Sequence, residues 1–121
     1  MDLEKILPAT GPSINEVEKY IEKYFTEIIV IKWGGSVLLD KNLFNQFIED
    51  VSVIYKLGLS VIIVHGGGKN IQKKLDKLNI ESKFIDGLRD TDERTIKVVK
   101  KTLLELNYES LNNLNNLQTN Q

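Results

Sequence analysis

The sequence predicts an α/β fold, a three-layer α/β sandwich whose mostly parallel sheet lies between helices. Two apolar runs of strand type, EIIVIK at 27–32 and LSVIIVH at 59–65, flank a segment with helical spacing. Near-continuous apolar runs are typical of strands buried on both faces of a parallel sheet. Strands that alternate with helices favour parallel pairing through crossover connections. A shorter stretch, KFID at 83–86, predicts a third strand, after which no further strand follows.

Apolar residues that recur about every 3.6 positions predict the helices. Ser13 and Glu16 form a capping-box pattern at the start of the first helix, and Gly58 stops the second. The predicted helices cover residues 14–25, 42–57, 69–79 and 93–106. In the last of these we expect the inward side chains to be Ile96, Val99, Leu103 and Leu104.

The chain divides into three parts by composition. Residues 1–26 are an N-terminal extension with its own helix, residues 27–106 form the main domain, and residues 107–121 are an asparagine-rich tail. Leucines three residues apart in the tail allow a frayed helix. The N-terminal helix has two readings, because its apolar stripe can pack on its own domain or serve as an arm that contacts another subunit.

Composition excludes several classes of protein. The 121 residues include 16 basic and 17 acidic side chains, a balance that does not favour nucleic acid as the main partner. Cysteine is absent, so a disulfide framework and a thiolate metal site are excluded. No apolar run approaches the ~20 residues that span a bilayer, and the N-terminus lacks a secretory signal pattern. We therefore expect a cytoplasmic protein without a membrane partner.

Glycines gather where the predicted strands end. Three of the 8 glycines stand at 66–68, between the second strand and a helix, and Gly34 and Gly35 follow the first strand. Glycine permits positive φ and lets backbone N–H groups approach a ligand closely. Such N–H groups at a helix start form an anion-binding place. Ligands of parallel sheets bind beyond the carboxyl ends of the strands, which is where both clusters are predicted.

Two cations stand at or after the ends of predicted strands, Lys32 in the first strand and Arg89 on the loop after Gly87. Lys32, just before the first cluster, can neutralise charge on a transferred phosphoryl group, and Arg89 can hold a carboxylate in bidentate fashion. The alternative is that the glycine pair is a tight turn and both cations are surface charges. His65, the single histidine, is better suited to bonding the turn than to catalysis. The GGGK segment lacks the spacing of a P-loop, so the residues alone predict an anion site suited to phosphoryl transfer.

Three motifs in order, IVIKWGGSVLLD, IIVHGGGK and FIDGLRDTD, resemble the acetylglutamate kinases of the amino acid kinase family over about residues 27–106. The GLR-x-TD loop is the most particular of the three. The resemblance implies phosphorylation of the side-chain carboxylate of N-acetyl-L-glutamate by ATP, with Mg²⁺, in arginine biosynthesis. It implies no tightly bound cofactor and no metal ligand in this chain.

The resemblance also assigns site residues. It implies that Lys32 stabilises the transferring phosphoryl group and that Arg89 binds the α-carboxylate of the substrate. The glycine backbone supplies the rest: Gly34 and Gly35 face the ATP phosphates, and Gly67 and Gly68 hold the substrate.

Two further expectations follow from the resemblance. Hexameric, arginine-inhibited members carry a helix before the first strand, so we expect a homo-oligomer that extends to a hexamer through helix 14–25. Members of the family also continue past residue 121. We therefore expect the fold to be truncated to its N-terminal part, which carries the substrate-binding half and is inactive alone. The alternatives are a non-catalytic subunit that assembles with and modulates a full-length kinase, and a kinase of the same family for another carboxylate.

Overall fold

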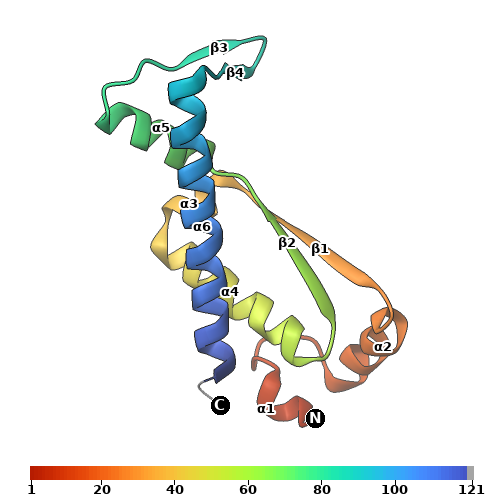
Figure 1. Cartoon of the computed structure of the whole chain (residues 1–121). Coiled ribbons are helices and arrows are strands. Elements are labelled where there is room, and N and C mark those ends of the chain that lie inside the picture. Colours follow the sequence, from red (N-terminus) through yellow and green to blue (C-terminus); the bar gives the residue numbers. More distant parts are fainter. Residues whose placement is uncertain (120–121) are drawn as a thin grey trace.

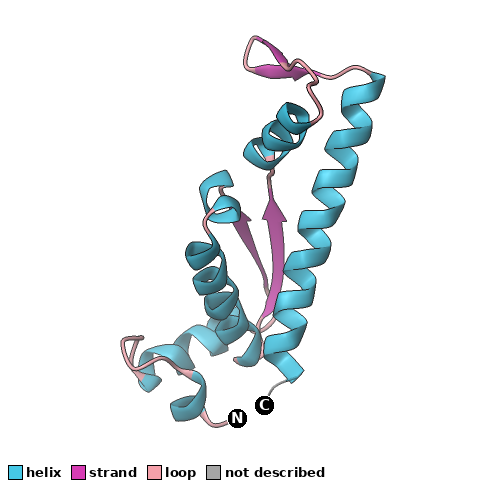
Figure 2. Ribbon diagram, turned by 90° about the vertical axis from the view of Figure 1, so that its left-hand side faces the viewer, coloured by secondary structure: helices cyan, strands magenta, loops and turns pink. Residues whose placement is uncertain are grey.

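The computed structural model describes residues 1–119 and has the α/β architecture that the sequence predicts (Figure 1). In chain order the elements are α1 (Leu3–Ile6), α2 (Ile14–Tyr24), β1 (Ile28–Trp33), α3 (Gly35–Leu39), α4 (Lys41–Lys56), β2 (Ser60–His65), α5 (Gly68–Lys77), β3 (Lys83–Ile85), β4 (Leu88–Asp90) and α6 (Glu93–Thr119). The longest element, α6, runs beside α4 and β2 along the length of the molecule (Figures 1 and 2).

Strands β1 and β2 form the parallel sheet. They pair in register from Ile28 opposite Ser60 to Trp33 opposite His65, and α3 and α4 make the connection between them. Their carboxyl ends therefore lie side by side, as the fold class requires.

The third predicted strand does not join this sheet. Strand β3 pairs with β4 in an antiparallel hairpin at one end of the molecule, away from the β1–β2 pair (Figure 1). The turn residues Asp86 and Gly87 have φ values of 50° and 79°. Two consecutive positive φ values suit the tight turn of a hairpin, so the chain reverses after three residues. The expectation that residues 83–86 extend the parallel sheet is therefore wrong. The expectation that no strand follows them is also wrong, because β4 does.

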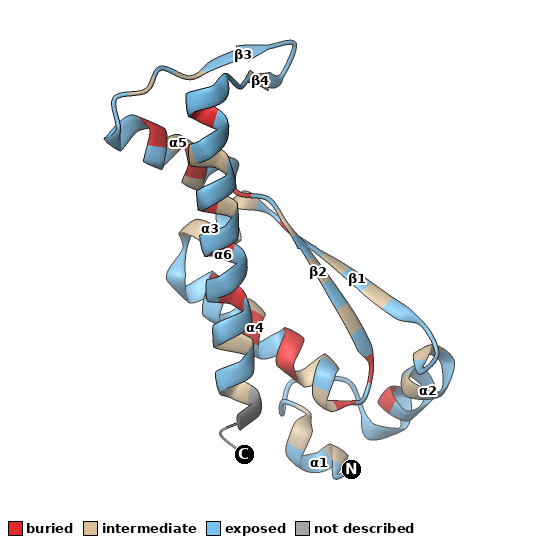
Figure 3. Ribbon diagram, in the orientation of Figure 1, coloured by how far each residue is buried: buried red, intermediate tan, exposed pale blue. Residues whose placement is uncertain are grey.

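The two faces of the β1–β2 pair differ in burial, which contradicts the expectation that both are buried. The open face is the face whose apolar side chains remain 49–62% exposed: Ile28, Val30, Ile62 and Val64. The covered face packs against α4 and α6 (Figure 3). Both strands consequently alternate between more exposed and less exposed residues. The described helices form a layer on only one side of the sheet.

The covered face holds the largest buried side chain. Trp33, at the end of β1, is 1% exposed and meets Phe44 and Phe47 of α4 edge-on, with ring centroids 5.5 and 4.6 Å away. Leu114 and Leu117 of α6 pack against the same cluster. This cluster fixes the end of β1, where the first glycine pair begins.

A second cluster lies at the other end of the sheet. Val17 of α2 is buried with Leu57 and Leu59, which stand at either side of Gly58. The capping box of Ser13 and Glu16 at the start of α2 is confirmed. Helix α2 thus packs on its own chain, as the first of its two readings requires. Gly58 has φ +84° at the end of α4, which confirms its predicted role as a stop.

Helix α6 continues past its predicted end at Leu106 to Thr119, so that boundary is wrong. Its extension is held by the leucines that reach the Trp33 cluster and by Ser110, which is buried. The last two residues of the predicted tail, 120–121, lie outside the described residues. The Asn-rich composition suggested fraying, but the apolar contacts of the helix decide its length.

The inward face of α6 also differs from the prediction. Of the four predicted side chains, Val99 and Leu103 are half-buried but Ile96 and Leu104 are exposed. The fully buried residues are Thr95, Thr102 and Leu106. The buried stripe is thus shifted from the predicted one. Small hydroxyl side chains suit a helix face that approaches its neighbours closely, and Thr102 satisfies its own hydroxyl by donating to the carbonyl of Val98 at 2.8 Å. None of the helices in residues 1–119 is long and apolar enough to cross a membrane.

Candidate functional site

The two glycine segments lie together at the carboxyl end of the sheet. Trp33 and His65 are register partners at the last position of their strands, so the segments that follow are neighbours. Gly34 does not form the tight turn of the alternative interpretation but caps the short helix α3 in an extended conformation. Helix α3 packs against α5, and a Cβ added to Gly35 would lie 3.9 Å from the side chain of Lys69.

Lys32 stands one residue before the end of β1 and points to the open face. Its register partner is Val64, another open-face residue. Within residues 1–119, Lys32 forms neither an ion pair nor a hydrogen bond through its side chain. A lysine at this place has a free ammonium group beside the two glycine segments.

The three glycines at 66–68 do not share one role. Gly67 is buried, and its φ of 170° is extended, so positive φ is not the reason for glycine there. A Cβ on Gly67 would lie 2.9 Å from Cδ2 of Leu103 and 3.0 Å from Cδ1 of Leu106. Around Gly66 and Gly68, no heavy atom of the described chain would come within 4 Å of such a Cβ, apart from their sequence neighbours and, for Gly68, the backbone of its own helix. Glycine at 67 thus admits α6, while its two neighbours face open space.

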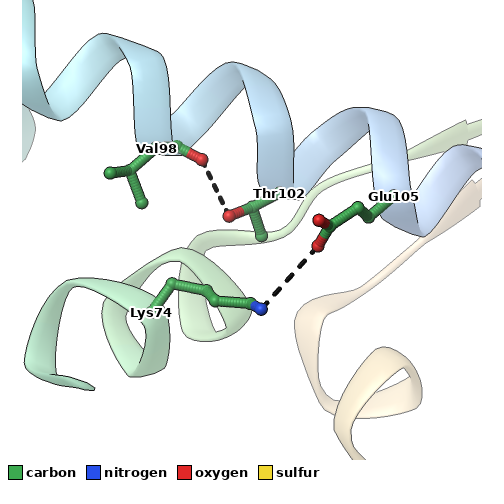
Figure 4. Close-up of polar contacts among 4 residues, drawn as sticks. All are labelled: Lys74, Val98, Thr102 and Glu105. Carbon is green, nitrogen blue, oxygen red and sulfur yellow. Dashed lines mark hydrogen bonds and ion pairs between the residues drawn. The ribbon is translucent and has the colours of Figure 1, made fainter. Parts of the chain in front are cut away.

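Helix α6 reaches the glycine segment by packing along α5. Lys74 of α5 points to Glu105 of α6, with Nζ 3.8 Å from Oε2, and Thr102 lies on the same stretch of α6 (Figure 4). Both charged side chains are about half exposed, so this ion pair contributes little. The apolar packing of α6 against α5 and beside Gly67, where Leu106 is buried, therefore contributes more to this attachment than the ion pair does.

Arg89 comes to the glycine segment from the hairpin. Its Nη2 donates to the carbonyl oxygen of Gly68 at 3.4 Å, and its Nη1 donates to Oε1 of Gln72 at 3.0 Å. Nη1 also donates to the Ser82 hydroxyl, and the guanidinium carbon lies 4.7 Å from the centre of the Phe84 ring. The structure therefore joins Arg89 and Gly68, two residues that the sequence placed in one site although 21 positions separate them.

Sequence reasoning missed Gln72 and Ser82 as partners of Arg89. A signal for Gln72 exists, because it follows Gly68 by four positions and so lies on the same face of α5. Ser82 has no comparable signal, since its contact depends on where the hairpin folds. His65 was interpreted correctly: its Nδ1 lies 2.8 Å from the carbonyl oxygen of Gly66, so it bonds the turn.

The charges around the site favour an anion. Lys32, Lys69 and Arg89 flank the glycine segments, and none of them belongs to the ion pairs found in residues 1–119. No group of three or more His, Cys, Asp or Glu side chains in that part of the chain is arranged to hold a metal ion. The arrangement can bind a carboxylate or phosphate through guanidinium, ammonium and backbone N–H groups.

Comparison with known proteins gives the following matches. The sequence model of a protein family, described as the amino acid kinase family, matches residues 27–119. An acetylglutamate kinase from Pelagibacter ubique is 56% identical over 116 residues, which are 96% of this chain and 40% of that protein. An acetylglutamate kinase from Campylobacter fetus is 44% identical over 97 residues, which are 80% of this chain and 35% of that protein.

A solved structure shows the same fold. N-acetylglutamate synthase from Neisseria gonorrhoeae, complexed with coenzyme A and N-acetyl-glutamate, superposes with a TM-score of 0.68 at 19% sequence identity. The match covers 85% of this chain and 25% of that one. This chain therefore spans 40% or less of the length of each of these three proteins.

Proposed function

We propose that this chain, which belongs to the amino acid kinase family, carries the substrate-binding part of an acetylglutamate kinase. The resemblance noted in the sequence is confirmed by relatives of that name at up to 56% identity. The observation that carries the proposal is the contact between Arg89 and Gly68, which joins a carboxylate-binding group to the glycine segment. The full activity, the substrates and the partners are part of the proposal.

The proposed reaction is an in-line phosphoryl transfer. An oxygen of the side-chain carboxylate of N-acetyl-L-glutamate attacks the γ-phosphorus of ATP. The new oxygen–phosphorus bond forms as the bond to the bridging oxygen breaks, and ADP leaves with that electron pair. The product is an acyl phosphate, and the step belongs to arginine biosynthesis. Such a transfer needs positioning and charge neutralisation and no covalent intermediate on the protein.

Each predicted residue has a role in this scheme. Arg89 binds the α-carboxylate, and Lys32, with its unpaired ammonium group, stabilises charge on the phosphoryl oxygens. The backbone serves both substrates: Gly34 and Gly35 face the ATP phosphates, and Gly67 and Gly68 hold N-acetyl-L-glutamate. The described residues offer no set of three carboxylate or imidazole ligands for the Mg²⁺ that accompanies ATP, so no step is assigned to that ion.

A calorimetric titration of the chain with N-acetyl-L-glutamate tests this function. We expect binding in the wild type and loss of binding in Arg89→Ala. The matched control is Arg94→Ala, because Arg94 is the second arginine of the chain and is exposed on α6. Binding that survives Arg89→Ala, or that Arg94→Ala removes equally, would contradict the assignment. We expect the 121 residues alone to give no ATP-dependent turnover, because they match 40% or less of each kinase.

The second candidate is a non-catalytic subunit that assembles with a full-length kinase through α2. The outer side of α2 and its C-cap residue supports this second candidate, since Tyr20 and Phe25 are exposed while Val17 packs inward. The same surface supports a homo-oligomer, a hexamer included. A pull-down with a full-length relative, repeated with Tyr20→Ala, tests the idea. Failure of the wild-type chain to co-assemble would remove it.

A further inference from the structure

The partners of Arg89 are all neutral. A guanidinium group has five N–H donors, two on each Nη and one on Nε. Those of Nη1 are directed to the Gln72 amide oxygen and the Ser82 hydroxyl, and Nη2 reaches the Gly68 carbonyl. Within residues 1–119, Nε–H has no acceptor, and no carboxylate pairs with the guanidinium. The group is thus held in place while its charge and its Nε edge stay available.

We propose that Gln72 and Ser82 are positioning residues that hold Nη1 of Arg89, so that its Nε edge faces a substrate carboxylate. The inference rests on the proposed function, because it presumes that Arg89 binds such a carboxylate. Two parallel N–H donors on one edge of a guanidinium match the two oxygens of a carboxylate. That edge consists of Nε–H and one N–H of Nη2, so the partners on Nη1 lie off it. The Gly68 carbonyl takes one of the two N–H groups of Nη2 and leaves the other for the substrate.

The amide of Gln72 has a fixed orientation. Its Nε2 donates to Oδ1 of Asp76 at 2.8 Å, so its oxygen is the atom that faces Arg89. Asp76 lies one turn further along α5 and is exposed. The Asp76 carboxylate therefore contacts the neutral amide and not the guanidinium of Arg89. An acid at position 72 would instead form an ion pair with Arg89 and weaken its attraction for a substrate anion.

The hairpin supplies the other constraints. Ser82 precedes β3, and Phe84 within β3 presents its ring to the guanidinium plane. Arg89 is the register partner of Phe84 across the hairpin. Cross-strand pairing thus places the ring and the arginine on one face, and the contact to Gln72 ties that face to α5. The three contacts together leave the arginine few alternative rotamers.

Nitrogen NMR can measure this ordering directly. The chain has two arginines, so the ¹⁵Nε–¹Hε signals of Arg89 and Arg94 can be assigned by one substitution. We expect Arg89 Nε to be ordered on the nanosecond timescale and the exposed Arg94 to be mobile, which gives a reference within each sample. Titration with N-acetyl-L-glutamate supplies the affinity.

Three substitutions separate position from charge. In Gln72→Ala, Arg89 should become mobile and the affinity should fall about tenfold, the loss typical of a hydrogen bond to a charged group. In Gln72→Glu, Arg89 should stay ordered, yet the affinity should fall at least as far. Ser82→Ala removes the other Nη1 partner and should mobilise Arg89 independently of α5. The matched control is Gln46→Ala, since Gln46 bonds Asp50 four residues on in α4, at 3.1 Å, with no arginine involved.

The outcomes distinguish this inference from the proposed function. The positioning role is overturned if wild-type Arg89 is as mobile as Arg94, or if Gln72→Ala changes neither mobility nor affinity. It is also overturned if Gln72→Glu binds as tightly as the wild type. A wild-type chain that orders Arg89 through Gln72 but binds no N-acetyl-L-glutamate would support the positioning and reject the proposed substrate. Gln46→Ala should leave both measurements unchanged.

Discussion

The two faces of the β1–β2 pair give neighbouring residues of β1 opposite environments, one buried and one exposed. Trp33 on the covered face is the most enclosed large side chain at its end of the sheet, and it anchors α4 and α6. Lys32, one residue earlier, is on the open face without a partner in residues 1–119. Because side chains alternate along a strand, one strand end supplies both the core anchor and the free cation. The packing of Trp33 therefore determines where the backbone of Lys32 lies.

The largest effect should come from the covered face. Trp33→Ala should lower the free energy of unfolding by about 3–5 kcal/mol, because it empties a site between two aromatic rings. Urea unfolding followed by circular dichroism measures this loss. Lys32→Met is the control and should change stability by less than about 0.5 kcal/mol, since it removes an exposed side chain. Equal costs for the two substitutions would mean that the faces do not differ as described.

Trp33→Phe refines this test. In residues 1–119 the indole Nε1 is buried without an acceptor, which is unfavourable for folding. Phenylalanine removes that donor and keeps most of the ring, so it should cost clearly less than alanine. A cost as large as that of alanine would contradict this prediction, because phenylalanine keeps most of the apolar contacts of the ring.

The next effect concerns the glycine segment 66–68, which follows β2 at the carboxyl end of the sheet. Gly67→Ala should destabilise by about 1–3 kcal/mol, because its Cβ would press on Leu103 and Leu106 of α6. Gly66→Ala is the matched control, and its Cβ would meet open space. Thermal unfolding of the two variants gives the difference. If both cost the same, contact with α6 is not the reason for glycine at 67.

Much of this arrangement was predictable because local signals determine it. The capping box of Ser13, the stop at Gly58 and the two apolar strands all act within a few residues, and each was located correctly. The proximity of the two glycine segments was also predictable, because neighbouring parallel strands end at the same edge of the sheet. The link from Arg89 to Gly68 was suggested only by resemblance to a family.

The parts that failed depend on distant contacts. The sequence of β1 could not show which face the helices cover. Every residue but Lys32 is apolar, so apolar and polar residues do not alternate along the strand. Residues 83–86 have the sequence of a strand whether they join the parallel sheet or form a hairpin. The left-handed conformation of Asp86 in the turn is specific to the hairpin. The asparagine-rich composition predicted a tail after residue 106. Only the structure shows that Leu114 and Leu117 pack against the Trp33 cluster and so belong to α6.

A smaller, pH-dependent effect is expected where α6 begins. Asp92 accepts the backbone N–H of Thr95 at 2.7 Å, and this bond, with the Thr95 hydroxyl, lowers the pKa of Asp92 below its usual 3.8. A lowered pKa in the folded state means that the contribution to stability is present above the unfolded value. It is lost as the pH falls through the folded value.

Asp92→Asn gives the comparison, because asparagine can cap a helix but cannot ionise. The difference in unfolding midpoint between wild type and variant should be constant near neutral pH and should shrink once the pH falls below 3.8. Urea titrations across that range measure it. A difference that grows on acidification would contradict the sign of the shift. This comparison tests the start of α6 and changes no residue of the covered face.

The smallest effect should come from the open face, through a pair of identical substitutions. Val30 is on the open face and Val61, which lines a cavity of about 370 Å³ between β2, α4 and α6, is on the covered one. Val30→Thr should change stability by less than about 0.5 kcal/mol, whereas Val61→Thr should cost about 1 kcal/mol because it replaces a methyl group by a hydroxyl on the less exposed face. Denaturation at two protein concentrations completes the test, because a parallel sheet is normally covered on both faces. If Val30→Thr costs as much as Val61→Thr, and only at the higher concentration, then the open face is covered by association in solution. If the costs are equal at both concentrations, the asymmetry of the sheet does not hold, and Lys32 is less accessible than its place on that face implies.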